Sequence, residues 1–269
     1  MPLDRGDHVA WRDALGEHTR ALIAEAAGTF MFFVIGAGSI VAQVVAGSAS
    51  TGLLAVSLAH GLALSVAVSA LGAISGGHFN PAVTFGLAVA AKHQWERVPT
   101  YWAAQLVGAL AAGYSLKLFF DFAPAAADAT HLGTPTVAAS LAPGTAIFVE
   151  AILTVFLLWA VFGTAVSPNA PRIAGFGIGL TVAADILVGG PLTGAAMNPA
   201  RWFGPAVAAQ FIASNWYVYW VGPLVGGGLA GLSYRYVFGA AGEREPISLP
   251  GATPAEEPPA ASQRGEKVP

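Results

Sequence analysis

Two identical triplets in the sequence have side chains that suit the handling of small polar molecules. Asn80-Pro81-Ala82 and Asn198-Pro199-Ala200 share a spacing of 118 residues (198 − 80), and each opens a short apolar segment. Asparagine is a favoured helix cap and proline suits the first helical position, so each triplet predicts a helix start. Two ordinary capped helices are the simplest interpretation, but it does not explain why the two starts are identical.

The segments that follow the triplets, 81–91 and 199–211, are too short to cross a membrane. A bilayer core of about 30 Å requires about 20 residues at about 1.5 Å per residue. Each segment therefore reaches only the bilayer midplane. Six other apolar stretches are long enough to cross, at 21–45, 52–74, 99–120, 144–166, 173–190 and 216–238.

The composition is that of a membrane protein. Of the 269 residues, 55% are hydrophobic and 10% are charged, against about 25% charged in an ordinary soluble domain. The 12 basic and 15 acidic residues form no basic face for nucleic acid. No cysteine is present and the six histidines are scattered, so we expect no metal site and no cofactor. No catalytic cluster is evident, and we expect no enzyme.

The surroundings of the triplets also repeat. Ser75-Gly-Gly-His-Phe-Asn-Pro-Ala-Val-Thr-Phe-Gly86 resembles Thr193-Gly-Ala-Ala-Met-Asn-Pro-Ala-Arg-Trp-Phe-Gly204, and Glu25 and Glu150 each head the first helix of a half. Since each half has three spans, the second half must enter the membrane from the opposite side. We predict an all-α membrane protein with six transmembrane helices and two re-entrant half-helices in an inverted repeat. The channel domain covers 21–238, with repeats over 21–121 and 144–238.

The basic residues predict the orientation of this multi-pass membrane protein. Lys and Arg collect in cytoplasmic segments, and cytoplasmic termini leave only Lys117 and Arg201 outside that pattern. The polar segment 1–20 is expected to be a cytoplasmic lead-in, and the Pro-, Ala- and Glu-rich segment 239–269 a disordered cytoplasmic tail. We expect the protein to be located in the cell membrane.

Two half-helices that meet at the midplane predict a water-filled path. Irregular backbone at that depth survives only where protein or a wet cavity satisfies its polar groups. Each half-helix start carries about +0.5 charge, which opposes cations, and its asparagine amide donates hydrogen bonds without relaying protons. Backbone carbonyls before the triplets would accept from water, namely those of Gly76, Gly77, His78, Phe79, Gly194, Ala195 and Ala196.

The sequence resembles the aquaporin (major intrinsic protein) family over about Glu25–Phe238. The motifs that carry the resemblance are those above together with Ala59-His60-Gly61, Gly190-Pro-Leu-Thr-Gly194 and Tyr219-Trp-Val-Gly-Pro-Leu-Val-Gly-Gly-Gly-Leu-Ala-Gly231. Within it the chain is most similar to the tonoplast intrinsic type. The resemblance implies a passive water channel that excludes protons and ions at the triplets and forms homotetramers in the lipid bilayer. It also implies that Glu25 and Glu150 support the re-entrant loops, although intramembrane acids also suit a proton relay. By position, the selectivity filter would be His60, Ile186, Ala195 and Arg201.

The filter residues predict the range of solutes. Ile186 beside Ala195 should leave a wider opening than family filters with Phe or a second His, so we expect water with some ammonia, urea or hydrogen peroxide. An ammonia or urea facilitator is the alternative. Glycerol-type members resemble a pattern with Asp after the filter arginine, whereas this chain has Trp202, which argues against a glycerol channel. A proton-coupled transporter would need titratable side chains along the path. The midplane offers only the amides of the two asparagines, which argues against such a transporter.

Several side chains have two interpretations. His60 is a filter residue or a satisfied core histidine, and Arg201 is expected to face water and backbone carbonyls. Asp185, where tonoplast-type relatives tend to have Asn, either pairs with Arg201 or holds the loop before Asn198, or else it is protonated and hydrogen-bonded. His131 leans over the mouth or is a surface histidine, and Trp202 replaces a residue that is usually small.

Overall fold

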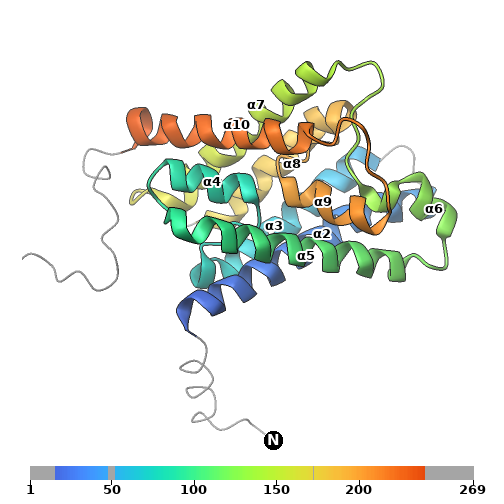
Figure 1. Cartoon of the computed structure of the whole chain (residues 1–269), viewed down its shortest axis with the longest axis horizontal. Helices are drawn as coiled ribbons and strands as arrows, with labels where there is room; N and C mark the ends of the chain where they lie inside the picture. Colours follow the sequence, from blue (N-terminus) through green and yellow to red (C-terminus); the bar gives the residue numbers. More distant parts are fainter. Residues whose placement is uncertain (1–15, 48–51, 172, 240–269) are drawn as a thin grey trace, which may run out of the picture.

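The computed structural model describes residues 16–47, 52–171 and 173–239, and every regular element in these ranges is a helix (Figure 1). Most of the predicted lead-in over 1–20 lies outside the described residues, and so does the predicted tail over 239–269 after Gly239. The last residues of the lead-in, Glu17 to Arg20, form the first turn of a long helix.

The helices follow the predicted repeat. The first half contains α2 (Glu17–Val45), α3 (Gly52–Ser75), the short α4 (Pro81–Val89) and α5 (Val98–Phe119). The second half has the same order, and two of its helices end in a π-helical turn: α7 (Pro143–Val161, continued by Phe162–Val166), α8 (Ala174–Thr193), α9 (Pro199–Ala208) and α10 (Val218–Ser233, continued by Tyr234–Phe238). The predicted helix boundaries differ from the observed ones by a few residues.

Four of the described helices are long and apolar enough to cross a membrane by length and composition alone: Glu17–Val45, Gly52–Ser75, Pro143–Val166 and Gly175–Thr193. The other two long helices of the bundle are less apolar or shorter. α5 carries Gln105 and Lys117, and α10 has 16 residues before its π-helical turn. Both pack against helices that do qualify, so the bundle aligns them as spans.

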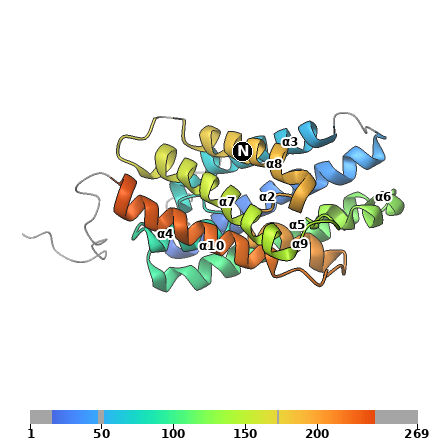
Figure 2. The same cartoon turned by 90° about the horizontal axis from the view of Figure 1, so that it is seen from above.

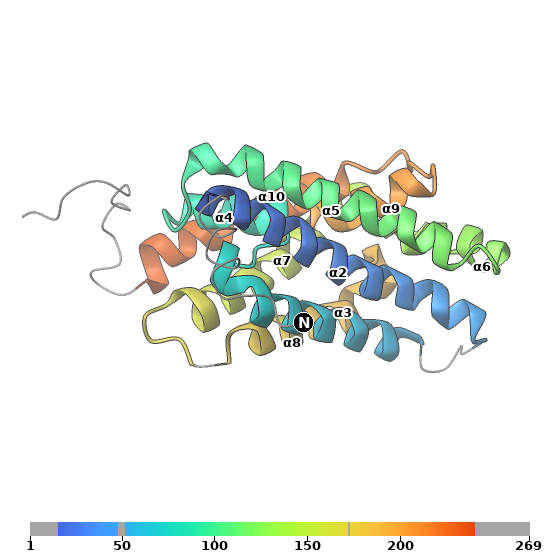
Figure 3. The ribbon, with the colours of Figure 1, turned by 90° about the horizontal axis from the view of Figure 1, so that it is seen from below.

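The two halves interlock through their short helices. α4 packs along α10 and α9 packs along α5, so each half-helix lies against the last long helix of the other half (Figures 2 and 3). Glycines permit this close approach. A Cβ on Gly227 would lie 2.6 Å from the carbonyl oxygen of Ala82, and one on Gly113 would lie 2.5 Å from that of Gly204.

Apolar side chains cover the outside of the bundle, and a smaller number of polar side chains are buried within its largely apolar interior. Leu118 is 75% exposed and Val188 is 67% exposed, whereas Glu25, Gln105 and Glu150 are completely buried. Lipid is as apolar as these outer side chains, so the surface is stable in a bilayer and the interior can hold polar groups.

The connection between the halves contains two short helices that the sequence did not predict, α6 (Pro124–Ala129) and η2 (His131–Gly133). A third short helix, η1 (Trp95–Arg97), precedes α5. In η2, Leu132 and Gly133 are buried, and η2 packs against α2 and α9. This connection therefore folds inward over the end of the bundle and brings its backbone to the functional site.

Candidate functional site

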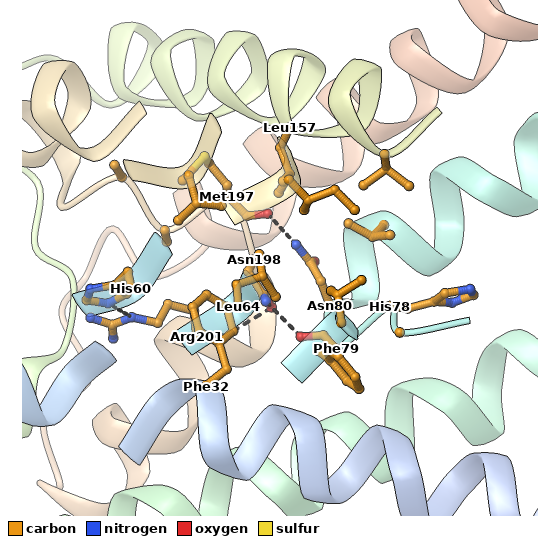
Figure 4. A pocket seen from close by; sticks show the side chains of 18 of the residues that line it. Phe32, His60, Leu64, His78, Phe79, Asn80, Leu157, Met197, Asn198 and Arg201 are labelled. Carbon is orange, nitrogen blue, oxygen red and sulfur yellow. Dashed lines mark hydrogen bonds between the residues drawn. The ribbon is translucent and has the colours of Figure 1, made fainter. Parts of the chain in front are cut away.

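The two half-helices begin beside each other in the middle of the bundle, and the predicted asparagines cap them (Figure 4). Asn80 Oδ1 accepts from the N–H of Ala82 at 2.8 Å, and Asn198 Oδ1 accepts from that of Ala200 at 2.9 Å. The backbone is extended at both caps, with φ of −159° and −158°. The triplets therefore form equivalent helix starts.

The caps also join the two loops to each other. Asn80 Nδ2 donates to the carbonyl oxygen of Met197 at 2.9 Å, and Asn198 Nδ2 donates to that of Phe79 at 3.0 Å. A carboxamide nitrogen has two N–H groups, so one on each asparagine is left for another acceptor. The predicted carbonyl of Phe79 thus already accepts a hydrogen bond within the protein.

The loops before the caps have the same unusual backbone. Phe79 and Met197 have φ of 47° and 52°, and Gly76 and Gly194 have φ of 93° and 81°. A positive φ costs a non-glycine residue roughly 1 kcal/mol or more, so surrounding contacts must hold Phe79 and Met197 in place.

Glu25 supplies such contacts for the first loop. Its carboxyl oxygens accept from the N–H groups of His78 at 3.0 Å and Phe79 at 2.7 Å. They also accept from the Ser75 hydroxyl at 2.7 Å and from Gln105 Nε2 at 2.8 Å. Because Glu25 is completely buried, four donors converge on a carboxyl group that water does not reach.

Glu150 does the same for the second loop. It accepts from the N–H groups of Ala196 at 2.9 Å and Met197 at 2.6 Å, and from the Thr193 hydroxyl at 2.6 Å. Tyr219 donates to the Thr193 carbonyl at 2.9 Å, as Tyr101 donates to that of Ser75 at 2.8 Å. The donors in the two loops recur at the 118-residue spacing, the two glutamates that accept from them are 125 residues apart (150 − 25), and Gln105 has no counterpart.

A narrow cavity runs through this centre. Its volume is about 20 Å³, little more than the roughly 10–15 Å³ that one water molecule requires. It extends from His60 and Arg201 at one end to His78 at the other and passes both asparagines. Of the predicted carbonyl-bearing residues, Gly77, His78, Phe79, Ala195 and Ala196 line it, whereas Gly76 lines a second cavity and Gly194 lines neither.

The four predicted filter residues, His60, Ile186, Ala195 and Arg201, meet at one end of the cavity, and each is at most 4% exposed. Arg201 Nε donates to His60 Nε2 at 3.0 Å, and Arg201 Nη1 donates to the Gly133 carbonyl at 2.9 Å (Figure 4 shows the first bond). His60 Nδ1 lies 2.8 Å from the Val56 carbonyl. His60 is therefore a neutral Nδ1–H tautomer that holds Arg201 and offers no N–H to the cavity.

His78 occupies the opposite end of the cavity. Its Nδ1 lies 3.0 Å from the Thr84 hydroxyl, which donates to the Asn80 carbonyl and accepts from Gln105. Because the hydroxyl proton is used on Asn80, the His78 Nδ1 carries the hydrogen of this pair. His78 Nε2 is then an acceptor.

The repeat accounts for the unusual Trp202. It stands 118 residues after Thr84, and in the second half the polar pair His78 and Thr84 is replaced by Ala196 and Trp202. The Trp202 ring stacks on Tyr219 with centroids 6.1 Å apart and planes at 9°. It packs in a buried apolar cluster with Ala196 and Tyr219, and its buried Nε1 has no hydrogen-bond partner in the described part of the chain.

Asp185 and His131 do not line the cavity. The Asp185 Oδ2 is buried without a hydrogen-bond partner among the described residues, and the side-chain hydrogen bonds of Arg201 go to His60 and Gly133. His131 stacks on Phe211 with centroids 3.5 Å apart and lines a separate cavity with Lys117. The arrangement agrees with the surface alternative for His131.

Comparison with known proteins identifies the family. The sequence profile described as Major intrinsic protein matches residues 14–234. The chain belongs to the major intrinsic protein family. It is therefore an aquaporin-type channel in a membrane and not an enzyme.

The relatives of this channel are of the tonoplast intrinsic type, as the resemblance predicted. Aquaporin TIP2-1 of Arabidopsis thaliana is 44% identical over 236 residues, which cover 85% of this chain and 91% of that protein. Aquaporin TIP4-4 of Zea mays is 44% identical over 251 residues, which cover 87% and 96% of the two chains. The crystal structure of the aquaglyceroporin from Plasmodium falciparum has a TM-score of 0.74 at 24% identity, covering 82% of this channel and 97% of that chain. That last likeness confirms the fold.

Sequence reasoning missed several residues of this site. It missed Met197, which stands 118 residues after Phe79, and the tyrosines Tyr101 and Tyr219, which are 118 residues apart. The repeat spacing therefore contained the signal for these residues. The Gly133 carbonyl had no such signal. It reaches Arg201 only because the connection between the halves of the channel folds inward.

Proposed function

We propose that this channel conducts water in single file through the cavity between its half-helices and also admits small neutral solutes such as ammonia, urea and hydrogen peroxide. The main support is the pair of asparagine amides, Asn80 and Asn198, in the lining of a cavity whose volume is little more than one water molecule requires. The names of its relatives, which are aquaporins, agree with water as the solute.

Proton exclusion follows from the direction of the hydrogen bonds. Asn80 and Asn198 each hold one N–H in a bond to the opposite loop and have one left for a solute. A water that accepts from both turns its own hydrogens away from the centre, so the water chain cannot pass a proton there. The N-termini of α4 and α9 add positive potential of about +0.5 charge each, which opposes cations.

Selection by size and charge is assigned to the end that carries Arg201. Two of the five guanidinium N–H groups are held by His60 and Gly133, which leaves three for solutes. Ile186 and Ala195 supply apolar wall beside them. The lack of a bulky aromatic residue at these two positions favours solutes somewhat larger than water, and an ammonia or urea facilitator is the second candidate function.

The topology and assembly proposed here rest on sequence. Both termini are assigned to the cytoplasmic side by the distribution of Lys and Arg. We propose a homotetramer with a pore in each subunit, as the family resemblance implies, and chemical crosslinking in the bilayer tests it. The cell membrane stays a prediction, since the tonoplast type of the relatives is named after a different membrane.

Stopped-flow shrinkage of proteoliposomes tests the proposed function. Vesicles with the inserted protein should lose water severalfold faster than empty vesicles, without an accompanying proton leak. The same vesicles exposed to ammonia, urea, hydrogen peroxide and glycerol rank the solutes. Equal water permeability with and without the protein refutes the proposal, and uptake that requires a pH gradient would favour a proton-coupled transporter.

A cysteine at position 195 should make the pore sensitive to mercurials. The wild-type chain has no cysteine, so its water flux should resist them. Ala195 lines the cavity, and cysteine fits its backbone as well as alanine does because both carry a Cβ. We expect a mercurial to reduce the water permeability of Ala195→Cys to that of empty vesicles.

The matched control is Ala111→Cys on the exposed face of α5, outside the cavity lining. This variant should be labelled by the mercurial and still conduct. An Ala195→Cys variant that is labelled yet conducts normally places residue 195 outside the water path.

A further inference from the structure

A second cavity adjoins the inner end of the pore. Its volume is about 480 Å³, and it lies between the start of α2, the end of α3 and the segment that joins α4 to α5. His78 lines both this cavity and the pore. In the proposed topology this is the cytoplasmic side, so a molecule bound here lies over the cytoplasmic entrance of the pore.

Positive charge dominates the wall of this cavity. Arg20, Lys92 and Arg97 come from three different segments, and Glu17 is the one acid among its described lining residues. Neither Arg20 nor Arg97 forms an ion pair with a carboxyl group in the ranges that the structure describes. Glu96, although next to Arg97 in sequence, is not part of the lining. A cleft with charges of one sign concentrates ions of the opposite sign, here anions.

The rest of the polar wall is neutral. His93 packs edge-on against His78 and Tyr101, with ring centroids 4.8 and 4.6 Å away. Burial is the main cause that lowers the pKa of His93 to about 3, so this ring carries no charge at physiological pH. The positive charge of the cavity therefore comes from its two guanidinium groups and from Lys92, whose ammonium lies 5.8 Å from the Tyr234 ring.

These groups suit a phosphate better than a monatomic anion. A guanidinium group presents a planar fork of donors that matches two oxygens of one phosphate, and two such forks face a cavity with room for a polyatomic ion. A chloride ion offers a single centre and gains nothing from a fork. The apolar part of the wall is limited to Ala21, Ala73 and Ile74, and the other lining residues are polar, charged or glycine.

We propose that this cavity binds a phosphate group, and that the bound phosphate obstructs the pore at His78. The obstruction rests on the proposed water conduction, whereas the binding does not. Two sources offer the same chemistry, namely free inorganic phosphate and the phosphate monoester headgroup of a lipid such as phosphatidic acid. In either case Arg20 and Arg97 are the principal ligands and Lys92 contributes charge from the rim.

Calorimetric titration of the detergent-solubilised full chain with inorganic phosphate measures binding directly. Arg97→Gln should raise the Kd about tenfold, as expected for one charge-assisted contact, and Arg20→Gln combined with Arg97→Gln should abolish binding. Arg235→Gln is the matched control, because Arg235 is an exposed arginine outside the cavity lining whose Nη1 donates to the Val89 carbonyl. Its Kd should equal that of the wild type.

Water permeability of proteoliposomes then tests the obstruction and the source. Phosphate on the cytoplasmic face, against chloride at equal osmolarity, should slow wild-type shrinkage and leave the double variant unaffected. Phosphatidic acid in the bilayer, against phosphatidylglycerol, should do so without added phosphate if the lipid is the source. The permeability without either ligand reports on water conduction itself, so its failure is distinct from a failure of this proposal.

The outcomes separate cleanly. Binding that the double variant abolishes, with slowed shrinkage from either source, supports the proposal. If phosphate gives no heat of binding and does not slow shrinkage, the proposed phosphate site is wrong. Binding with unchanged shrinkage overturns the obstruction at His78, and equal losses in Arg235→Gln show a general surface-charge effect and overturn the assignment to the cavity.

Discussion

Replacing Arg201 with valine is expected to raise the permeability to cations and to neutral solutes such as urea about tenfold or more, with water permeability retained. A tenfold change in permeability corresponds to only about 1.4 kcal/mol of barrier. The repulsion between a passing cation and a positive charge fixed in a low-dielectric passage is larger than that. Arg201 is 3% exposed, lines the narrow cavity and is held by His60 and Gly133. Valine removes the charge and widens the passage together.

Two further variants separate these effects in the same proteoliposomes. Arg201→Lys keeps a cation but lacks the Nε–H that His60 accepts, so it should still exclude cations while its solute range broadens. Arg235→Val removes an arginine outside the cavity and should match the wild type. Unaltered cation and urea permeability in Arg201→Val would falsify the assignment of Arg201 to the filter.

The parts of this fold that the sequence predicted are those determined by local composition or by repetition. Hydropathy located the spans, and the length of the segments after Asn80 and Asn198 predicted half-helices because a nine- or ten-residue helix cannot cross the bilayer. The equal spacing predicted that both starts would be capped alike, and the Oδ1 bonds at 2.8 and 2.9 Å show the same cap twice.

The parts that could not be predicted depend on contacts between distant segments. The Gly133 carbonyl accepts from Arg201 because η2 folds inward, and nothing in the composition of 122–143 indicates that fold. The tautomer of His60 depends on both the Val56 carbonyl and Arg201, which lie on different helices. Asp185 is the converse case, since the sequence offered it partners in the loop or on Arg201 and its buried Oδ2 has none in the described residues.

Substituting Glu150 with glutamine is expected to destabilise the channel by roughly 2–4 kcal/mol and to abolish most of its water conduction. Both oxygens of Glu150 accept, from the N–H groups of Ala196 and Met197 and from the Thr193 hydroxyl. Glutamine replaces one oxygen by an amide donor, which faces a backbone donor and leaves it buried and unpaired at about 1–3 kcal/mol, besides the lost bond itself. Met197, at a φ of 52°, then lacks the contact that holds it.

Thermal unfolding of the purified variant and water permeability per inserted molecule are the two measurements. The first should show a lower transition temperature, and the second should fall because a displaced Met197 carbonyl no longer holds Asn80 Nδ2. A variant as stable as the wild type with full water flux contradicts the role of Glu150 in holding the loop.

Glu25→Gln should have the same kind of effect but a smaller one. The first loop has Gln105, whose Nε2 donates to Glu25 and whose buried Oε1 has no partner among the described residues. Rotation of the Gln105 amide would present that oxygen to the new glutamine and relieve one of the unfavourable contacts, although it gives up the Nε2 bond to the Thr84 hydroxyl, so the relief is partial. The second half has Pro223 at the corresponding position, so Glu150→Gln has no such relief.

A proton relay through Glu25 and Glu150 predicts a different pattern. The stability of both variants would be unchanged, and both would be equally defective only in transport driven by a pH gradient. The order of the two unfolding temperatures therefore distinguishes loop support from proton transfer without reference to flux.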